Sequence, residues 1–239
     1  MQIILIIGRV ALAVTQTLKL AGIRGIIAQK MAESLEKTAQ LSFFCDIDVS
    51  ALVAARGAWK DSGAKIGYED MIAKALANVL QKFPAFNGVE TPAGVELHDE
   101  IHVGCAIALP GALVAPAISN VERLSLPEIA AIRQDLVARA KINKLTIAEL
   151  TGATVTITNL GLTRVEHFTP ILTYPQQAII GLGRIMPKAC VDTDGVTIVA
   201  RQMMGLSLTV DHRTIDGGPA GDFLSALAVA LESAEGLQP

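Results

Sequence analysis

The chain has 239 residues, of which 51% are apolar and 18% charged, and its formal net charge is −3. A chain of this length forms one large domain or two small ones and can bury a full core. The small negative charge excludes electrostatic attraction to nucleic acid or to an anionic membrane as the basis of function. The high apolar content predicts a large subunit interface in addition to the core.

The N-terminal segment, residues 1–14, is apolar but is interrupted by Arg9. It is shorter than the roughly 20 residues that a membrane-spanning helix requires, and no signal-peptide cleavage site stands out. A buried strand, or an arm lying on a neighbouring subunit, explains it at least as well. We therefore predict an N-terminal arm or linker remnant over residues 1–18 and one folded domain over residues 19–239.

The first half of this domain mixes helices with strands. Apolar residues at helical spacing predict helices over residues 23–35, 50–62 and 68–82, the second with Ser50 as its N-cap. An alternating run predicts a strand over residues 41–49. Residues 88–100 are turn-rich, whereas two β-prone runs flank Pro110-Gly111 and predict a hairpin, over residues 101–109 and 113–118.

The second half opens with a helix-capping signal at residues 125–128, which predicts a helix ending near Lys141. β-Prone runs predict four strands, over residues 154–158, 177–183, 196–202 and 203–210, the third entered through a turn at 192–195. A closing helix is predicted over residues 219–231. Because helices and strands do not alternate strictly, the expected fold class is α+β with a mixed sheet.

The segment that follows the last predicted strand reads Asp-His-Arg-Thr-Ile-Asp-Gly, at residues 211–217. It places His212 at a rigid strand end, next to a loop that can open onto a cleft, and this position suits a general base. Asp216 is close enough in sequence to hold the same turn or a neighbouring cation. Taken by itself, the spacing is also compatible with a purely structural turn.

The three cysteines, Cys45, Cys105 and Cys190, are far apart and odd in number. This pattern predicts reduced, buried thiols rather than a disulfide framework. The histidines have no zinc-ligand spacing with these cysteines. No metal site is therefore predicted.

Six motifs occur in one order along the chain: RGIIAQKMAES (residues 24–34), DIDVSAL (46–52) followed by Arg56, FPAFN (83–87), LTGATVTITNLG (150–161), YPQQA (174–178) and DHRTIDG (211–217). Together they resemble the catalytic domain of the dihydrolipoyl acyltransferase component of 2-oxo acid dehydrogenase complexes. The resemblance runs from about Lys19 to Leu237. Several co-linear motifs are far more specific than any one of them.

The resemblance implies an α+β fold like that of chloramphenicol acetyltransferase. It implies a homotrimer with active sites at subunit interfaces, assembled further into hollow cubic or dodecahedral cores (a 24-mer or a 60-mer). The implied reaction is acyl transfer between dihydrolipoyl-lysine, carried on a separate domain or chain, and coenzyme A. The implied partners are a lipoyl domain, a 2-oxo acid decarboxylase and a dihydrolipoyl dehydrogenase, in the cytoplasm or, in a eukaryote, the mitochondrial matrix.

The resemblance also implies roles for single residues. His212 would take the proton of the attacking thiol, whose pKa when free is near ~8.5. Thr158 stands where the family has Ser or Thr and is the candidate donor to the tetrahedral oxyanion. Without the resemblance it is equally a strand threonine that packs its methyl group. Asp216 is expected to hold an arginine, either Arg24 or Arg213, and so to shape the loop around the histidine; some members of the family also use this carboxylate in catalysis, and Asp216 is counted with His212 and Thr158 as a candidate catalytic residue.

For coenzyme A, the resemblance implies contacts from Arg56 and Asn159. Without the resemblance, Arg56 is equally a solvated arginine at a helix end, and Asn159 is equally a turn residue. The chain departs from the family at Gly67, where many members have Ser or Thr, so a cofactor hydroxyl contact is missing or supplied elsewhere. It departs again over residues 163–168, which replace a glycine-rich stretch and are expected to alter the acyl pocket.

Two alternatives stay open. One is a stand-alone coenzyme A-dependent acyltransferase acting on a small molecule, as chloramphenicol acetyltransferase does. That relative has a second histidine where this chain has Asp211, a difference that favours the lipoyl reading; Asp211 itself is expected to be structural, in a surface or interface ion pair. The other alternative is a non-catalytic scaffold, against which the presence of His212, Asp216 and Thr158 argues.

Overall fold

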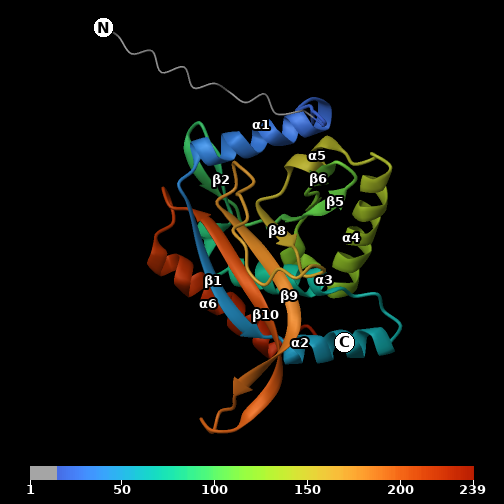
Figure 1. The fold of residues 1–239 in the computed structure, drawn as a ribbon, viewed down its shortest axis with the longest axis vertical. Helices are drawn as coiled ribbons and strands as arrows, with labels where there is room; N and C mark the ends of the chain where they lie inside the picture. Colours follow the sequence, from blue (N-terminus) through green and yellow to red (C-terminus); the bar gives the residue numbers. More distant parts are fainter. Residues whose placement is uncertain (1–14) are drawn as a thin grey trace.

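The computed structural model describes residues 15–239 (Figure 1). The predicted arm over residues 1–18 therefore lies outside the described residues, except for residues 15–18, which are exposed and belong to no helix or strand. In the described part of the chain, no helix is long and apolar enough to cross a bilayer.

Six α-helices and ten strands make up the described chain. The helices are α1 (Gly22–Lys37), α2 (Ser50–Asp61), α3 (Tyr68–Leu80), α4 (Leu126–Lys141), α5 (Ile147–Thr151) and α6 (Gly217–Ser233). The strands are β1 (Gln40–Asp48), β2 (Gly88–Thr91), β3 (Gly94–Leu97), β4 (Val103–Cys105), β5 (Ile107–Leu109), β6 (Ala112–Val114), β7 (Ala117–Ile118), β8 (Val155–Asn159), β9 (Ala178–Val191) and β10 (Ile198–Asp211).

Six of these strands form the main sheet, in the order β1-β10-β9-β8-β4-β7. β8 runs parallel to both β4 and β9, whereas β10 is antiparallel to β9 and to β1. The predicted α+β class with a mixed sheet is therefore confirmed. At the end where β9 and β10 turn, their hairpin projects beyond the rest of the molecule (Figure 1).

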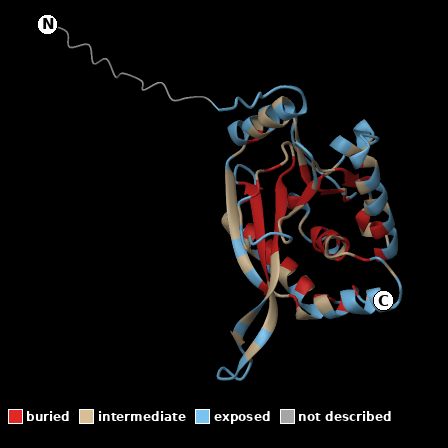
Figure 2. Ribbon diagram, turned by 45° about the vertical axis from the view of Figure 1, so that its right-hand side comes forward, coloured by how far each residue is buried: buried red, intermediate tan, exposed pale blue. Residues whose placement is uncertain are grey.

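Helices α3 and α6 pack on one face of the sheet, with α2 and α4 beside them (Figure 1). The apolar stripe predicted for the closing helix is buried against the sheet: Phe223 and Leu227 are fully buried and Leu224 nearly so. Phe223 stacks on Phe86 with ring centroids 4.1 Å apart. The buried residues in Figure 2 accordingly lie in the sheet and on the inner sides of these helices, where they form one core.

The opposite face of the sheet is covered by the segment that connects β8 to β9. Its Glu166 carbonyl lies so close to the sheet that a Cβ atom on Gly183 or Gly205 would approach it to 2.0 Å or less. The ring of Phe168 occupies the corresponding space over Gly181. These glycines therefore allow the chain-specific residues 163–168 to cross directly over the sheet.

Several predicted boundaries need correction. Residues 88–100, predicted as turns, contain the β2–β3 hairpin, and the predicted strand 101–109 divides into β4 and β5. The strands predicted over 196–202 and 203–210 are one strand, β10, with a register shift near Gly205. Ser50 is the first residue of α2 and Val49 is its N-cap, and the Ser50 hydroxyl donates to the Asp48 carboxylate at 2.6 Å instead of capping the helix.

Candidate active site

His212 is the first residue after β10, as the sequence predicts. Its backbone N–H donates to the carbonyl oxygen of Ala39 at 2.8 Å, which ties the residue to the start of β1. The imidazole side chain is 42% exposed. The histidine is thus fixed through its backbone while its ring is open to an incoming substrate.

Asp216 is the N-cap residue of α6, and its side chain is 88% exposed. Its Oδ1 lies 3.7 Å from Nδ1 of His212, which is longer than a hydrogen bond but close enough to attract an imidazolium. Arg213 binds other carboxylates, and no ion pair within the described chain joins Asp216 to Arg24. The predicted arginine partner of Asp216 is therefore not found in a single chain.

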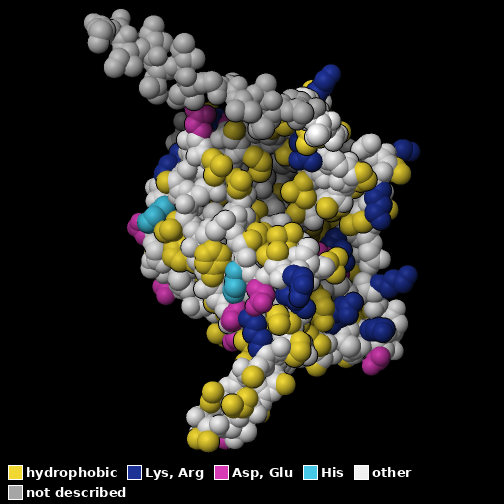
Figure 3. Space-filling view, in the orientation of Figure 1, with side chains coloured by type: hydrophobic (Ala, Val, Ile, Leu, Met, Phe, Trp, Pro, Cys, Tyr) yellow, Lys and Arg dark blue, Asp and Glu magenta, His cyan; other side chains and the backbone are white. Residues whose placement is uncertain are grey.

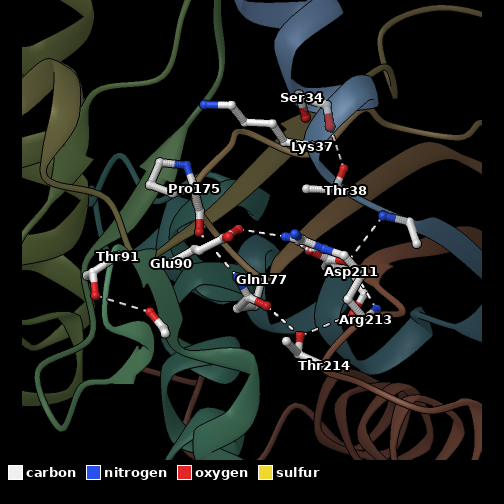
Figure 4. Close-up of polar contacts among 12 residues, drawn as sticks. Ser34, Lys37, Thr38, Glu90, Thr91, Pro175, Gln177, Asp211, Arg213 and Thr214 are labelled. Atoms are coloured by element: carbon white, nitrogen blue, oxygen red, sulfur yellow. Dashed lines mark hydrogen bonds and ion pairs between the residues drawn. The ribbon is translucent and has the colours of Figure 1, made fainter.

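Asp211 is structural, but the prediction of a surface or interface ion pair is wrong because its side chain is fully buried. Figure 4 shows the Arg213 guanidinium between Asp211 and Glu90. Arg213 donates to Asp211 Oδ2 through Nε at 2.8 Å and Nη2 at 2.5 Å, and to Glu90 at 2.6 Å. The Ala39 N–H donates to Asp211 Oδ1 at 3.1 Å.

These contacts set the charge of Asp211. Burial alone raises the pKa of its carboxyl group, but the hydrogen bonds from Arg213 and from the backbone N–H of Ala39 outweigh it, so the pKa lies below its ordinary value. Asp211 is therefore a buried carboxylate that is ionised near neutral pH. It anchors the residues on both sides of His212 through Ala39 and Arg213.

Thr158 lies near the end of β8, on a different part of the sheet. It pairs with Gly181 of β9, which pairs with Ser207 of β10. His212 is five residues beyond Ser207, about 16 Å further along at the rise of a β-strand. In a single chain, therefore, Thr158 and His212 do not meet.

Asn159, the next residue, lines a pocket of about 350 Å³ together with Tyr68, Leu162 and Ile185, among others. Its amide is held on both sides: Nδ2 donates to Glu69 at 2.9 Å and Oδ1 accepts from the N–H of Gly161 at 2.7 Å. Arg56 is exposed, and its guanidinium lies 4.8 Å from the centre of the ring of Tyr68, one of the residues that line this pocket. Arg56 itself does not line the pocket, so Tyr68 is the residue that connects the two side chains expected to contact coenzyme A.

Tyr68, Glu69 and Arg133 belong to this site but were not singled out from the sequence. The departure from the family pattern at Gly67 could have drawn attention to them, because Gly67 stands just before α3, whose first residues are Tyr68 and Glu69. Arg133, on α4, is 63 residues away from its partner Asp70, and no local pattern marks it.

A second pocket, of about 620 Å³, lies beside α1. Apolar residues of α1 line it opposite Tyr174 and Pro175, and His98, Glu100 and His102 add polar groups. Figure 3 shows apolar side chains gathered below α1. Neither His212 nor Thr158 lines this pocket, so it is distinct from the two groups described above.

The remaining reactive groups are less suited to catalysis. The three cysteines are free, but only Cys105 is fully buried, so the prediction of buried thiols is wrong for the half-buried Cys45 and Cys190. Burial raises the pKa of Cys45 to about 11 and that of Cys105 to about 12, so neither provides a thiolate near neutral pH. His167 lies on the segment that covers the sheet, and its Nε2 lies 2.8 Å from the Asp46 carboxylate of β1. Within the described residues, no group of three or more His, Cys, Asp or Glu side chains is arranged to hold a metal ion.

The fold is that of chloramphenicol acetyltransferase, with which the structure aligns at a TM-score of 0.54 and 17% identity over 86% of this chain and 93% of that chain. Two further structures are much more similar, each with a TM-score of 0.85, 29% identity and 93% coverage of both chains. One is the cubic core of a pyruvate dehydrogenase multienzyme complex. The other comes from a study of a serine, a histidine and an asparagine in the catalytic mechanism of Azotobacter vinelandii dihydrolipoamide acetyltransferase.

Sequence comparison agrees with the fold. Residues 13–238 match the family model described as "2-oxoacid dehydrogenases acyltransferase (catalytic domain)", and the chain belongs to this family. It is 36% identical, over 91% of its length, to the dihydrolipoyllysine-residue acetyltransferase component of the Bacillus subtilis acetoin cleaving system. It is also 36% identical, over 86% of its length, to a probable mitochondrial succinyltransferase component of the 2-oxoglutarate dehydrogenase complex of Schizosaccharomyces pombe. The chain spans about half the length of these relatives, 55% and 47% respectively.

Proposed function

We propose that this chain transfers an acyl group between dihydrolipoyl-lysine and coenzyme A, with residues 19–239 as the catalytic domain. The observation that carries the proposal is His212, a half-exposed imidazole fixed by its backbone at the end of β10 in a chain of this family. The Azotobacter relative supports the assignment. Its named histidine and asparagine are four positions apart, as are His212 and Asp216, and its named serine precedes the histidine by a stretch similar to that between Thr158 and His212.

The chemistry follows from these groups. His212 takes the proton of the coenzyme A thiol, and the thiolate attacks the carbonyl carbon of the acyl-dihydrolipoyl thioester. The Thr158 hydroxyl donates a hydrogen bond to the oxyanion of the tetrahedral intermediate. The bond to the lipoyl sulfur then breaks, and the leaving thiolate recovers the proton from His212. The exposed Asp216 carboxylate, 3.7 Å from Nδ1, favours the imidazolium that exists between these two proton transfers.

The active site is completed by a second subunit. Thr158 and His212 are far apart in one chain, so one subunit supplies the histidine and a neighbour supplies the threonine. A homotrimer provides three such sites, and trimers then assemble as in the cubic core to which the chain is similar. The exposed apolar residues of the projecting β9–β10 hairpin, Val191, Val196 and Ile198, are consistent with such an interface.

Coenzyme A binds beside Asn159. The Arg56 guanidinium supplies a positive charge for its phosphates, and the second amide hydrogen of Asn159 remains available to it. The lipoyl group arrives on a separate domain or chain, which the 2-oxo acid decarboxylase charges and the dihydrolipoyl dehydrogenase reoxidises. The setting is the cytoplasm of a bacterium or the mitochondrial matrix of a eukaryote.

Replacing Thr158 tests the oxyanion role. The oxyanion exists only in the transition state and in the intermediate, so Thr158→Val should lower kcat by about 100-fold and change the KM values much less. Steady-state kinetics with each substrate varied in turn measure both quantities. An increase confined to KM would instead make Thr158 a binding residue.

The function itself is tested by incubating the protein with free dihydrolipoamide and acetyl-, succinyl- or isobutyryl-coenzyme A. Transfer with one of the three establishes the reaction and ranks the acyl groups. Failure with all three, at protein concentrations where the trimer is present, would overturn the proposal in favour of a small-molecule acyltransferase or a non-catalytic scaffold.

A further inference from the structure

We infer that Glu69 and Arg133 are positioning residues, which hold the Asn159 amide in the orientation that coenzyme A requires. This inference rests on the proposed function. The contacts that carry it form a continuous relay from the buried Asp70, through Arg133 and Glu69, to Asn159 at the end of β8.

The relay begins at a buried charge. Asp70 has no exposed surface, and a buried carboxylate requires a cation and hydrogen-bond donors. Arg133 of α4 provides both, because its Nε donates to Oδ1 and its Nη2 donates to Oδ2 at 3.0 Å. The N–H of Gly67 donates to the same Oδ2 at 2.7 Å. Asp70 thereby holds the Arg133 guanidinium and the backbone of Gly67 together at the start of α3.

Gly67 is what admits the guanidinium. A Cβ atom at this position would lie 2.9 Å from Nη2 of Arg133 and 3.3 Å from Oδ2 of Asp70. The space that a serine or threonine would occupy is therefore filled by the arginine. A side chain at this position would require the Arg133 guanidinium to shift, so the departure from the family pattern at Gly67 is compatible with the position that Arg133 occupies.

The other side of the guanidinium continues the relay. Nη1 of Arg133 lies 3.3 Å from Oε2 of Glu69, and Oε1 of Glu69 accepts from Nδ2 of Asn159 at 2.9 Å. Because Asn159 Oδ1 accepts from Gly161, the amide has a single orientation with one N–H free. Glu69 by itself would repel an anionic cofactor, and Arg133 offsets this charge, so a geometric role explains why a carboxylate stands here.

Glu69 is the residue to replace, because Arg133 cannot be removed without leaving Asp70 buried and unpaired. The Glu69 side chain is 31% exposed, so Glu69→Ala breaks the relay while keeping the Asp70–Arg133 pair. Glu69→Gln removes the charge and retains one oxygen that accepts from Asn159, but its NH2 group then replaces the oxygen that faces Arg133. The matched control is Asp135→Ala, which removes from α4 a carboxylate that is 58% exposed and pairs with Arg139.

Titration calorimetry with coenzyme A, on the assembled protein, measures the effect. Glu69→Ala should raise Kd by about tenfold, the loss of one charge-assisted hydrogen bond, and Glu69→Gln, which keeps only the bond to Asn159, should raise it by less, while Asp135→Ala stays near the wild-type value. In steady state, KM for coenzyme A should rise and KM for dihydrolipoamide should not. In an Asn159→Ala background, Glu69→Ala should have little further effect, because the two residues act as one unit.

A role of Glu69 through charge alone predicts the opposite pattern, in which Glu69→Ala and Glu69→Gln both bind coenzyme A more tightly. That result, or an unchanged Kd in both variants, would overturn the relay and leave the proposed function intact. If the wild-type protein failed to bind coenzyme A at all, both the proposed function and the relay would be refuted.

Discussion

His212→Ala should lower the rate of acyl transfer to dihydrolipoamide by at least ~100-fold, because the thiol must lose its proton before it attacks and a positioned base supplies that step. Folding and assembly should not change. The backbone N–H of His212, not its ring, contacts Ala39, and the alanine variant keeps that bond. The measurement is the initial rate with saturating acyl-coenzyme A, together with sedimentation of wild type and variant at equal protein concentration.

His167→Ala is the matched control for this prediction. His167 is also partly exposed, at 32%, and also lies beside a carboxylate, with Nε2 2.8 Å from Asp46. It differs from His212 in lying on the segment that crosses the sheet rather than at the end of β10. Its replacement should leave the rate close to wild type. Equal losses in the two variants, or full activity in His212→Ala, would remove His212 as the base.

The sequence predicts the parts of this site that are local along the chain. His212 and Asp216 are recognised because one short segment carries both, whereas the roles of Thr158 and Asn159 come only from the resemblance of their motif to the family. The helix periodicity of α3 and α6 is similarly local, and both helices have the predicted apolar stripe. These elements depend on spacing, which a sequence displays directly.

What the sequence does not show are the contacts between distant residues. Arg133 and Asp70 meet across 63 positions, and Asn159 and Glu69 across 90, without any motif that connects them. β10 is predicted as two strands that meet between Gln202 and Met203, whereas its pairing with β9 continues through both residues. That pairing joins two strands, and it becomes visible only when the chain is folded.

The contribution of the Asp211–Arg213 ion pair to stability depends on the burial of Asp211. At a surface, its pairing with Arg213 would contribute little, because water competes for both charges. With no exposed carboxylate surface, the pair becomes necessary, since an unpaired buried charge is expensive. The loop that carries His212 is consequently held by a contact whose loss affects the whole fold.

Arg213→Ala should therefore destabilise the protein by about 3–5 kcal/mol near neutral pH, because it leaves Asp211 ionised and buried without a cation. The wild-type pKa of Asp211 lies below its ordinary value, so the stability from this pair is fully present above the ordinary carboxyl pKa, near ~4, and is lost as the pH falls through the lower folded value. In the variant, burial without the guanidinium raises that pKa. As the pH falls, Asp211 is therefore protonated in the folded variant before it is protonated in the folded wild type, and the variant no longer buries an unpaired charge. The difference in unfolding free energy between wild type and variant should shrink as the pH falls from 7 toward about 4.

Urea unfolding of wild type and variant, at several pH values and one fixed protein concentration, measures this difference. Arg201→Ala is the matched control, because Arg201 also binds two carboxylates, Asp48 at 2.8 Å and Asp192 at 2.6 Å, but both are partly exposed. Its replacement should cost no more than about 1 kcal/mol. If the two variants lost the same stability, or if the loss in Arg213→Ala did not vary with pH, the buried Asp211 carboxylate could not be its cause.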